Sequence, residues 1–306
     1  MSADGVIGSG ALRQLIRRYY GDECRIIDVR KSGAHAFVFV CEATLRGRPL
    51  RLLGTVGRTR ELMEHSAMDL GQPERLVFPY ERMMFVAAAL VAQPRTILLL
   101  GLGGGAMLRH LAAYLPEAEV TVVERDPGVI AFAREHFYIR HKILRADAAD
   151  IVADAAGQYD LVMVDLYDAG GGASLGDEFW QDCAAALRPG GCIAVNWAGG
   201  WTGAGLDGTP QQRLADAIPP LAGSILLSER IVRGNIVQLA PSAPGLRVTS
   251  LGPHLRAFAE ARQLPREDRS ILLRCDVTRR YPAPRRTARL APAPGSAAGR
   301  GGKNGQ

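Results

Sequence analysis

The sequence is poor in aromatic residues, in paired cysteines and in long apolar runs. Phe, Trp and Tyr make up 6% of the 306 residues, too few for a protein that recognises single-stranded RNA by stacking on its bases. The five cysteines are odd in number and lack CxxC spacing, so we expect neither a disulfide framework nor a bound metal. The richest apolar stretch, residues 83–100, is interrupted at Gln93-Pro94-Arg95 before it could span a bilayer. Together with the lack of an apolar signal segment, these absences predict a cytoplasmic protein with reduced thiols.

Acidic residues are missing from the carboxyl end. Residues 281–306 contain five Lys and Arg residues and no Asp or Glu, so most of the net charge of +6 lies there. Basic ends of this kind bind polyanions weakly and without sequence preference, and we do not expect a nucleic-acid partner. The segment is also rich in Pro, Ala and Gly and contains too little apolar surface to fold. We therefore predict a disordered basic tail.

The first 62 residues predict a helix and a small antiparallel β unit. Residues 11–20 have apolar positions at helical spacing. Residues 36–41 and 50–56 are short apolar runs separated by a turn that contains Gly and Pro. Residues 80–91 then predict a helix that leads into a different pattern.

Apolar strands alternate with helices from residue 96 onward. This alternation is typical of βα units and predicts an α/β fold with a Rossmann-like, doubly wound, mostly parallel sheet. We expect strands at residues 96–100, 120–124, 142–145, 161–165 and 192–196, and helices at 106–114, 127–136, 148–156 and 178–187. Residues 224–230 and 235–240 predict closing antiparallel strands. The α/β domain thus spans residues 63–245, and residues 246–280 form a C-terminal closing segment.

The first of these strands runs directly into a glycine-rich loop and a helix. Gly101, Gly103 and Gly105 let the backbone turn tightly and approach a ligand that a Cβ would exclude, and the helix start offers free N–H groups. We therefore expect these glycines to contact a nucleoside ligand. Together with Ala106 they also match the GxGxxA pattern of dinucleotide-binding proteins, so a nicotinamide-dependent dehydrogenase is one alternative.

Acidic residues follow the next two strands. Glu124 comes about 20 residues after the glycines, where a carboxylate can accept both hydroxyls of a ribose. This position fits either NAD or an adenosyl sulfonium. Asp147, followed by Ala148, could hold the adenine amino group, cap the next helix, or do both.

Polar residues at the ends of the last two strands distinguish between these ligands. Asp165 and Asp168 lie three residues apart, and together they can hold a cation and accept a proton from an attacking amine. A dehydrogenase has no evident need for this pair. Asp168 could alternatively cap a helix or be solvated in the loop. Asn196 is a candidate contact for the edge of the cofactor.

The motifs, taken in order, resemble the spermidine synthase (polyamine aminopropyltransferase) family, which has the class I methyltransferase type of fold. The resemblance extends over most of the chain, including the small amino-terminal β unit. The segments that carry it are Phe78-Pro79-Tyr80-Glu81-Arg82-Met83, Leu99-Leu100-Gly101-Leu102-Gly103-Gly104-Gly105, Val122-Val123-Glu124-Arg125-Asp126-Pro127, Ala146-Asp147-Ala148, Val164-Asp165-Leu166-Tyr167-Asp168 and Leu187-Arg188-Pro189-Gly190-Gly191.

The resemblance implies a role for each of the site residues. Glu124 would bind the ribose and Asp147 the adenine. Asp165 would be the catalytic base or an amine-orienting carboxylate, and Asp168 and Tyr80 would line the amine site. The resemblance also implies a homodimer and a small-molecule amine as acceptor.

The sequence departs from the family at two positions. The family carries Asp at the position of Gly104, where it holds the ammonium of the transferred aminopropyl group, and a carboxylate at the position of Arg82. Burying that ammonium without a carboxylate is costly. Full S-adenosylmethionine brings its own carboxylate, which could meet Arg82 or the N–H groups at the helix start. We therefore expect a preference for donors other than decarboxylated S-adenosylmethionine.

These observations predict a spermidine synthase-like transferase that moves an alkyl group of aminopropyl type from an adenosyl sulfonium to an amine. The donor is S-adenosylmethionine or its decarboxylated form. No metal is needed, because the sulfonium already makes its thioether a good leaving group. The alternatives are an S-adenosylmethionine-dependent methyltransferase and a nucleoside-binding pseudoenzyme, and the dehydrogenase ranks last.

Overall fold

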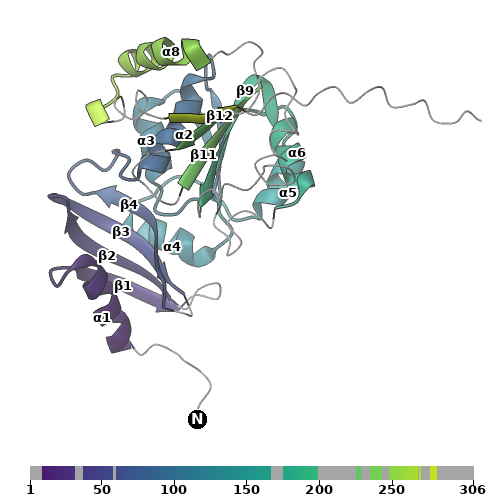
Figure 1. The fold of residues 1–306 in the computed structure, drawn as a ribbon. Coiled ribbons are helices and arrows are strands. Elements are labelled where there is room, and N and C mark those ends of the chain that lie inside the picture. The colour runs from purple at the N-terminus through teal and green to yellow at the C-terminus, as the bar shows by residue number, and fades with distance from the viewer. Residues whose placement is uncertain are drawn as a thin grey trace, which may run out of the picture.

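A small amino-terminal lobe packs against a larger α/β lobe in a computed structural model of the chain (Figure 1). Asp168 and the predicted tail lie outside the residues that the structure describes. Those residues are 9–31, 37–57, 60–166, 175–198, 225–228, 235–242, 248–267, 269 and 276–280.

The amino-terminal lobe is a four-stranded antiparallel sheet with one helix packed on it. Leu12 and Ile16 of the helix are fully buried against Phe39 and Leu52 of the sheet. The sheet has the order β1-β2-β3-β4, and its last strand pairs with β3 as far as Asp69. The predicted boundary at residue 62 therefore falls at the start of the fourth strand of this sheet. The elements are α1 (Ser9–Tyr20), β1 (Arg25–Lys31), β2 (Phe37–Leu45), β3 (Arg48–Val56) and β4 (Leu62–Asp69).

The larger lobe is built on an eight-stranded mixed sheet. Its order is β12-β10-β11-β9-β8-β5-β6-β7; β9, β8, β5, β6 and β7 run parallel, and β11, β10 and β12 close one edge in antiparallel fashion. The strands are β5 (Thr96–Leu100), β6 (Glu119–Val123), β7 (Ile143–Leu144), β8 (Tyr159–Val164), β9 (Leu187–Ala198), β10 (Ile225–Ser228), β11 (Asn235–Pro241) and β12 (Asp276–Arg280).

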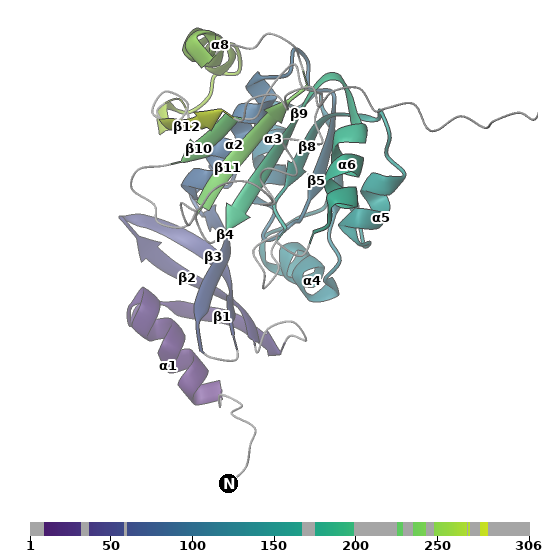
Figure 2. The same cartoon turned by 45° about the vertical axis from the view of Figure 1, so that its right-hand side comes forward.

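Helices cover both faces of this sheet, because successive residues of a strand point to opposite sides. Along β5, Ile97 and Leu99 join the core beneath α2, α3, α4 and α8, whereas Leu98 and Leu100 join the core beneath α5 and α6. The two layers are visible on either side of the strands in Figure 2. The helices are α2 (Pro79–Ala89), α3 (Ala106–Tyr114), α4 (Pro127–His136), α5 (Ala148–Ala153), α6 (Asp177–Ala185) and α8 (Val248–Ala261).

The predicted α/β fold is confirmed, with strand ends that shift by a few residues. Helices α3 and α4 have the predicted bounds, while β7 is only two residues long and α5 ends three residues early. Strand β9 begins at Leu187, five residues before the predicted start and at the last residue of the helix predicted at 178–187. The sequence did not predict β1, β4, α8 or β12. The last two occupy the predicted closing segment, and β12 joins the sheet beside β10.

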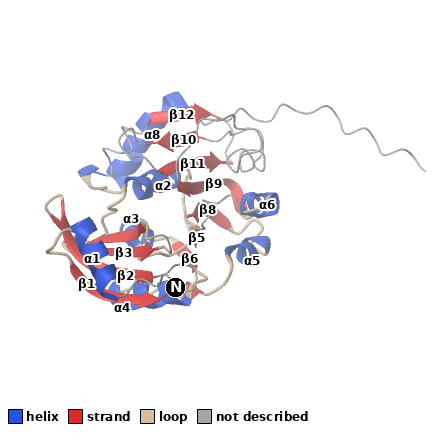
Figure 3. Ribbon diagram, turned by 60° about the horizontal axis from the view of Figure 1, so that its bottom comes forward, coloured by secondary structure: helices blue, strands red, loops and turns tan. Residues whose placement is uncertain are grey.

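A network of polar side chains joins the two lobes. Asp28 of β1 accepts a hydrogen bond from Arg30 and lies 2.9 Å from Nε2 of His136 in α4, while Arg30 also contacts Glu135. In Figure 3 the amino-terminal strands lie beside α4. The two carboxylates and the imidazole lie within 4.8 Å of one another, as metal ligands do, but the guanidinium of Arg30 donates to both carboxylates. The cluster is therefore an ion-pair network in which Arg30 bridges the two carboxylates.

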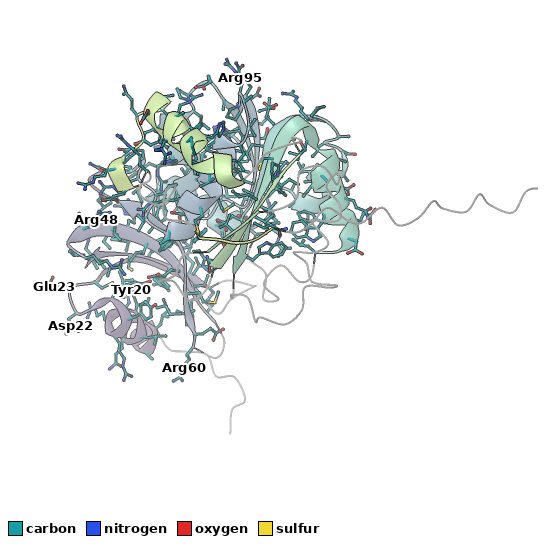
Figure 4. The ribbon with its side chains drawn as sticks, turned by 45° about the horizontal axis from the view of Figure 1, so that its top comes forward. Tyr20, Asp22, Glu23, Arg48, Arg60 and Arg95 are labelled. Atoms are coloured by element: carbon teal, nitrogen blue, oxygen red, sulfur yellow. The ribbon has the colours of Figure 1, made fainter. Side chains whose placement is uncertain are left out.

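A second contact between the lobes is made by Arg48 of β3, labelled in Figure 4, which pairs with Glu267 beyond α8. Arg51, on the same strand, donates to the carbonyl of His136.

Among the described residues, no helix combines the length and apolarity needed to cross a bilayer.

The strand order reverses between β5 and β8. From β5 the chain continues to β6 and β7 on one side of β5, and it then returns to form β8 on the opposite side of β5. Open α/β sheets bind ligands at such a switch point, beyond the carboxyl ends of the strands. The glycine loop follows β5 and Asp165 follows β8. The topology thus places both predicted motifs at the edge where a ligand is expected.

Candidate functional site

The glycine loop requires glycine at two positions for steric reasons. Gly101 has a φ of 96°, and a Cβ there would collide with the carbonyl oxygen of Asp165. Gly105 has a φ of 72°, and its Cβ would come within 2.5 Å of Ile139. Gly103, with a φ of 51°, leaves more room, since its Cβ would lie 3.4 Å from the carbonyl of His65. The loop is thereby folded against β4 on one side and against the end of β8 on the other.

Glu124 is hydrogen-bonded to this loop, and its ribose-binding role stays a prediction. It follows β6, and its Oε2 accepts a hydrogen bond from the backbone N–H of Leu102 at 3.2 Å. Its Oε1 accepts from the N–H of Asp126 at 2.8 Å. Burial raises the pKa of Glu124, which these backbone N–H groups partly offset. The carboxylate is thus held at the mouth of the sheet beside the glycines.

Asp147 and Ala148 lie at the next βα junction, after β7. Asp147 caps α5, because its Oδ1 accepts a hydrogen bond from the N–H of Ala149 at 3.0 Å. Its other oxygen lies 3.7 Å from Arg125. The capping role is therefore present, and the adenine-binding role stays a prediction.

Asp165 is held by two side chains from different elements. Its Oδ1 accepts a hydrogen bond from Nδ2 of Asn196 at 2.8 Å, and its Oδ2 accepts one from the hydroxyl of Tyr80 at 3.4 Å. Burial raises the pKa of Asp165, while the hydrogen bonds from Asn196 and Tyr80 lower it. Burial and the nearby Asp165 also raise the pKa of Tyr80, so the phenol stays a donor. A fixed, buried carboxylate of this kind can accept a proton from a bound amine.

A second carboxyl group, which the sequence did not single out for the site, lies in the first turn of α2. Glu81 is 4% exposed, and its Oε2 accepts a hydrogen bond from the N–H of Phe78 at 3.0 Å. Burial raises the pKa of Glu81 to about 8, and the charge of Asp165 also raises it. A Glu three residues after a helix N-cap was the available signal, but it indicates only a capping residue.

Arg109 is a further residue that the sequence did not reveal. From the first turns of α3 it donates to the carbonyls of Gly104 at 2.7 Å, Phe137 at 3.3 Å and Pro73 at 3.0 Å. Burial lowers its pKa to about 10, which the charge of Glu81 partly offsets. By tying three segments together, this guanidinium fixes the shape of the glycine loop.

Gly104 and Arg82, the two positions that depart from the family pattern, have different surroundings. At Gly104 a Cβ would approach Oγ of Ser66 to 2.9 Å and the ring of Phe137 to 3.0 Å, so the position has little room for a side chain. Arg82 contacts the carbonyl of Leu76 and lies 3.8 Å from Glu267. A donor carboxylate at Arg82 would therefore have to compete with Glu267.

The buried Glu81 carboxyl predicts a pH-dependent effect on stability. Because its folded pKa of about 8 lies above the ordinary glutamate value of 4.5, the folded state favours the protonated acid, and stability falls as pH rises from 4.5 through 8. Glu81→Gln stays neutral and can still accept from Phe78. We expect its melting temperature to match the wild type near pH 5 and to exceed it by several degrees above pH 8, since about 1 kcal/mol moves the midpoint of such a domain by about 2–4 °C.

Thermal unfolding followed by circular dichroism across this pH range checks the expectation. The exposed Glu178, in the first turn of α6, provides the matched control as Glu178→Gln. A difference between Glu81→Gln and the wild type that stays constant from pH 5 to pH 9 would contradict it.

The structure thus brings most of the predicted site residues to one edge of the sheet. Those residues are Tyr80, Gly101, Gly103, Gly105, Glu124 and Asp165, with Asp147 and Ala148 at the adjoining junction. Asp168 lies outside the described residues.

Comparison with known proteins agrees with this geometry. Residues 97–191 match the model of the methyltransferase domain family. Over 185 residues the chain is 33% identical to the polyamine aminopropyltransferase of Chromobacterium violaceum, covering 57% of this chain and 67% of that protein. The chain belongs to the polyamine aminopropyltransferase family. A second member, from Neisseria meningitidis serogroup A, is 31% identical over 183 residues, with the same coverage of both chains.

Solved structures show that the fold is that of this family and of methyltransferases. A spermidine synthase in complex with the transition-state analogue AdoDATO superposes with a TM-score of 0.57 at 18% identity, covering 81% of this chain and 88% of that one. Human methyltransferase-like protein 13 in complex with SAH gives a TM-score of 0.51 at 24% identity, covering 62% and 95%. The chain is a transferase of the polyamine aminopropyltransferase and methyltransferase superfamily, with the class I methyltransferase fold.

Proposed function

We propose that this protein transfers an alkyl group of aminopropyl type from an adenosyl sulfonium donor to a small-molecule amine. The observation that carries the proposal is the placement of Asp165. The backbone carbonyl of Asp165 lies against Gly101, and its buried carboxylate is oriented by hydrogen bonds from Asn196 and Tyr80. Donor and acceptor would therefore meet beside a group that can take up the proton released by the reaction.

The proposed binding mode of the nucleoside follows from the loop. Gly101, Gly103 and Gly105 let the backbone approach the donor, and Glu124 accepts the ribose hydroxyls. Asp147 and Ala148, at the start of α5, would contact the adenine. The family resemblance also supports a homodimer in the cytoplasm.

The proposed reaction is a direct displacement. The amine nitrogen attacks the carbon next to the sulfonium, the C–S bond breaks with its electron pair going to sulfur, and the alkylated ammonium loses a proton to Asp165. Because the donor already carries a good leaving group, the site contributes mainly orientation and exclusion of water. Tyr80 and Asn196 fix the carboxylate, and we propose that Asp168 completes the amine site.

The crowding at Gly104 supports a preference for full S-adenosylmethionine as donor. Ser66 and Phe137 occupy the space that a side chain at Gly104 would need, so this position offers no carboxylate for a donor ammonium. Full S-adenosylmethionine offsets that ammonium with its own carboxylate. Transfer of its 3-amino-3-carboxypropyl group would leave methylthioadenosine, the same nucleoside that aminopropyl transfer leaves.

Methyl transfer from S-adenosylmethionine is the second candidate function. It is favoured by the methyltransferase-domain match over residues 97–191, which includes the glycine loop, Glu124, Asp147 and Asp165. This reaction would leave S-adenosylhomocysteine. The nucleoside product therefore distinguishes the two candidates.

Product analysis with each donor tests the proposal. Purified protein is incubated with putrescine and either S-adenosylmethionine or its decarboxylated form, and methylthioadenosine, S-adenosylhomocysteine and spermidine are quantified by mass spectrometry. We expect methylthioadenosine to form from S-adenosylmethionine about tenfold or more faster than spermidine forms from the decarboxylated donor, since an unpaired buried ammonium costs about 1–3 kcal/mol or more.

Each other outcome has a definite meaning. Accumulation of S-adenosylhomocysteine would favour the methyltransferase. Rapid spermidine formation that Asp165→Asn abolishes would refute the donor preference and make the protein a spermidine synthase with an altered loop. The absence of every product would favour a nucleoside-binding pseudoenzyme.

A further inference from the structure

Asn196 lies beside Asp165 at the carboxyl ends of two neighbouring parallel strands. Val164 of β8 pairs with Val195 of β9, so the residues that follow them emerge side by side. On its other side Asn196 pairs with Val237 of β11, which fixes its backbone from both directions. The side chain of Asn196 is therefore positioned by the sheet and not by a loop.

The two ends of the Asn196 amide have different surroundings. Nδ2 donates to Oδ1 of Asp165 at 2.8 Å. Oδ1 is buried and has no hydrogen-bond partner, and it is the only amide or carboxylate oxygen of a side chain in that condition among the described residues. Buried polar atoms are almost always paired, so an isolated acceptor next to a candidate catalytic carboxylate indicates a missing donor.

The adjacent residue shows that this part of the sheet can satisfy its polar groups. The indole N–H of Trp197 donates to Oε1 of Gln238 at 3.0 Å, deep in the core. Residues 192–195, which precede Asn196 on β9, are fully buried and apolar. An amide at position 196 is therefore not required by the packing of the strand, and its unpaired oxygen belongs to the same amide group that donates to Asp165.

We propose that Asn196 contacts the acceptor amine and selects a primary amine. This inference rests on the proposed amine transfer. In a neutral primary amine, one N–H would donate to Oδ1 of Asn196 and the other to the carboxylate of Asp165, which leaves the lone pair free to attack the donor carbon. After the C–N bond forms and the C–S bond breaks, the new ammonium gives one proton to Asp165. A secondary amine has one N–H and leaves one of the two acceptors unpaired.

Comparison of two amines tests the selection directly. The probes are putrescine and N,N′-dimethylputrescine, whose nitrogens are both secondary, with S-adenosylmethionine and its decarboxylated form each supplied as donor. We expect the wild type to favour putrescine in kcat/KM by about tenfold or more, the consequence of one unpaired buried acceptor. Asn196→Leu, which has similar size and no polar atoms, is expected to bring this ratio close to one.

Gln238→Leu is the matched control, because it removes another buried amide from the neighbouring strand without touching Asp165. It is expected to reduce stability through the loss of the Trp197 contact while leaving the amine ratio unchanged. An unchanged ratio in Asn196→Leu would overturn the inference.

The pKa of Asp165 provides a measurement that does not depend on turnover. Carboxyl carbons in Asp-labelled protein are titrated by NMR, and the Asp165 signal is assigned from Asp165→Asn. Loss of the Nδ2 donor disfavours the charged carboxylate, so Asn196→Leu should raise the pKa of Asp165 by about one unit. A residue that only fills space would leave it unchanged, and that result would contradict the positioning role.

The proposed function and the role of Asn196 can be overturned by different results. If the wild type turns over neither amine, calorimetric binding of the two amines to the methylthioadenosine complex measures the same preference. Absence of both turnover and binding would overturn the proposed function and this inference with it. Turnover of both amines at equal efficiency by the wild type would overturn this inference alone.

Discussion

Asp165→Asn is expected to reduce the rate of alkyl transfer by about 10²–10⁴-fold, the range typical for removal of a positioned general base. The variant keeps the size of the side chain but cannot accept the proton that the attacking amine releases. Tyr80 can still donate to the remaining oxygen. Donor binding should change little, because in the proposed binding mode the glycine loop and Glu124 contact the nucleoside. Single-turnover kinetics with saturating donor measures the chemical step.

Asp160→Asn is a suitable control because Asp160 lies near the start of β8, the strand that Asp165 follows. Its carboxylate accepts from the backbone N–H groups of Arg95 and Thr96 at 2.9 Å, a structural role far from the glycine loop. We expect this variant to be less stable but to retain its turnover well below its melting temperature. A transfer rate within threefold of wild type in Asp165→Asn would remove Asp165 from the reaction.

Glu124→Ala is expected to weaken binding of every adenosyl ligand by about 10–100-fold. Two effects act in the same direction. In the proposed binding mode the ribose hydroxyls lose their charged acceptor. The N–H groups of Leu102 and Asp126 also lose theirs, which leaves the glycine loop less well held. Titration calorimetry with methylthioadenosine isolates this contribution, since that ligand lacks the amino-acid group.

Glu119→Ala tests whether the effect is specific to the site, because Glu119 is an exposed residue at the start of β6, the strand that Glu124 follows. We expect its affinity for methylthioadenosine to match that of the wild type. Equal affinities in Glu124→Ala and wild type would place the ribose elsewhere.

The strands and helices of the α/β lobe could be predicted because their apolar residues repeat at clear intervals. β5 and β8 are nearly continuous apolar runs, as expected for parallel strands covered on both faces. β4 was missed because polar residues such as Glu64, His65 and Ser66 interrupt its apolar pattern. Its place is determined by pairing with β3 and by packing of Ser66 against the glycine loop, neither of which is a local property.

The acidic residues of the site could be located because the carboxyl ends of parallel strands meet at one edge. Glu81 and Arg109 could not be located in this way, because they are on helices and their importance depends on burial beside the loop. Arg82 was expected to be available to a donor carboxylate, but it lies beside Glu267, a residue distant in sequence. Asn196 was expected at the edge of the cofactor, and this contact stays a prediction; the structure adds the hydrogen bond from its amide to Asp165.

A crystal structure of the protein with methylthioadenosine tests the central claim most directly. The account predicts that the ribose hydroxyls donate to Glu124, that the adenine lies beside Asp147 and Ala148, and that the thioether sulfur faces Asp165 across the glycine loop. A nucleoside bound outside the switch point between β5 and β8, or one whose sulfur points away from Asp165, would contradict it.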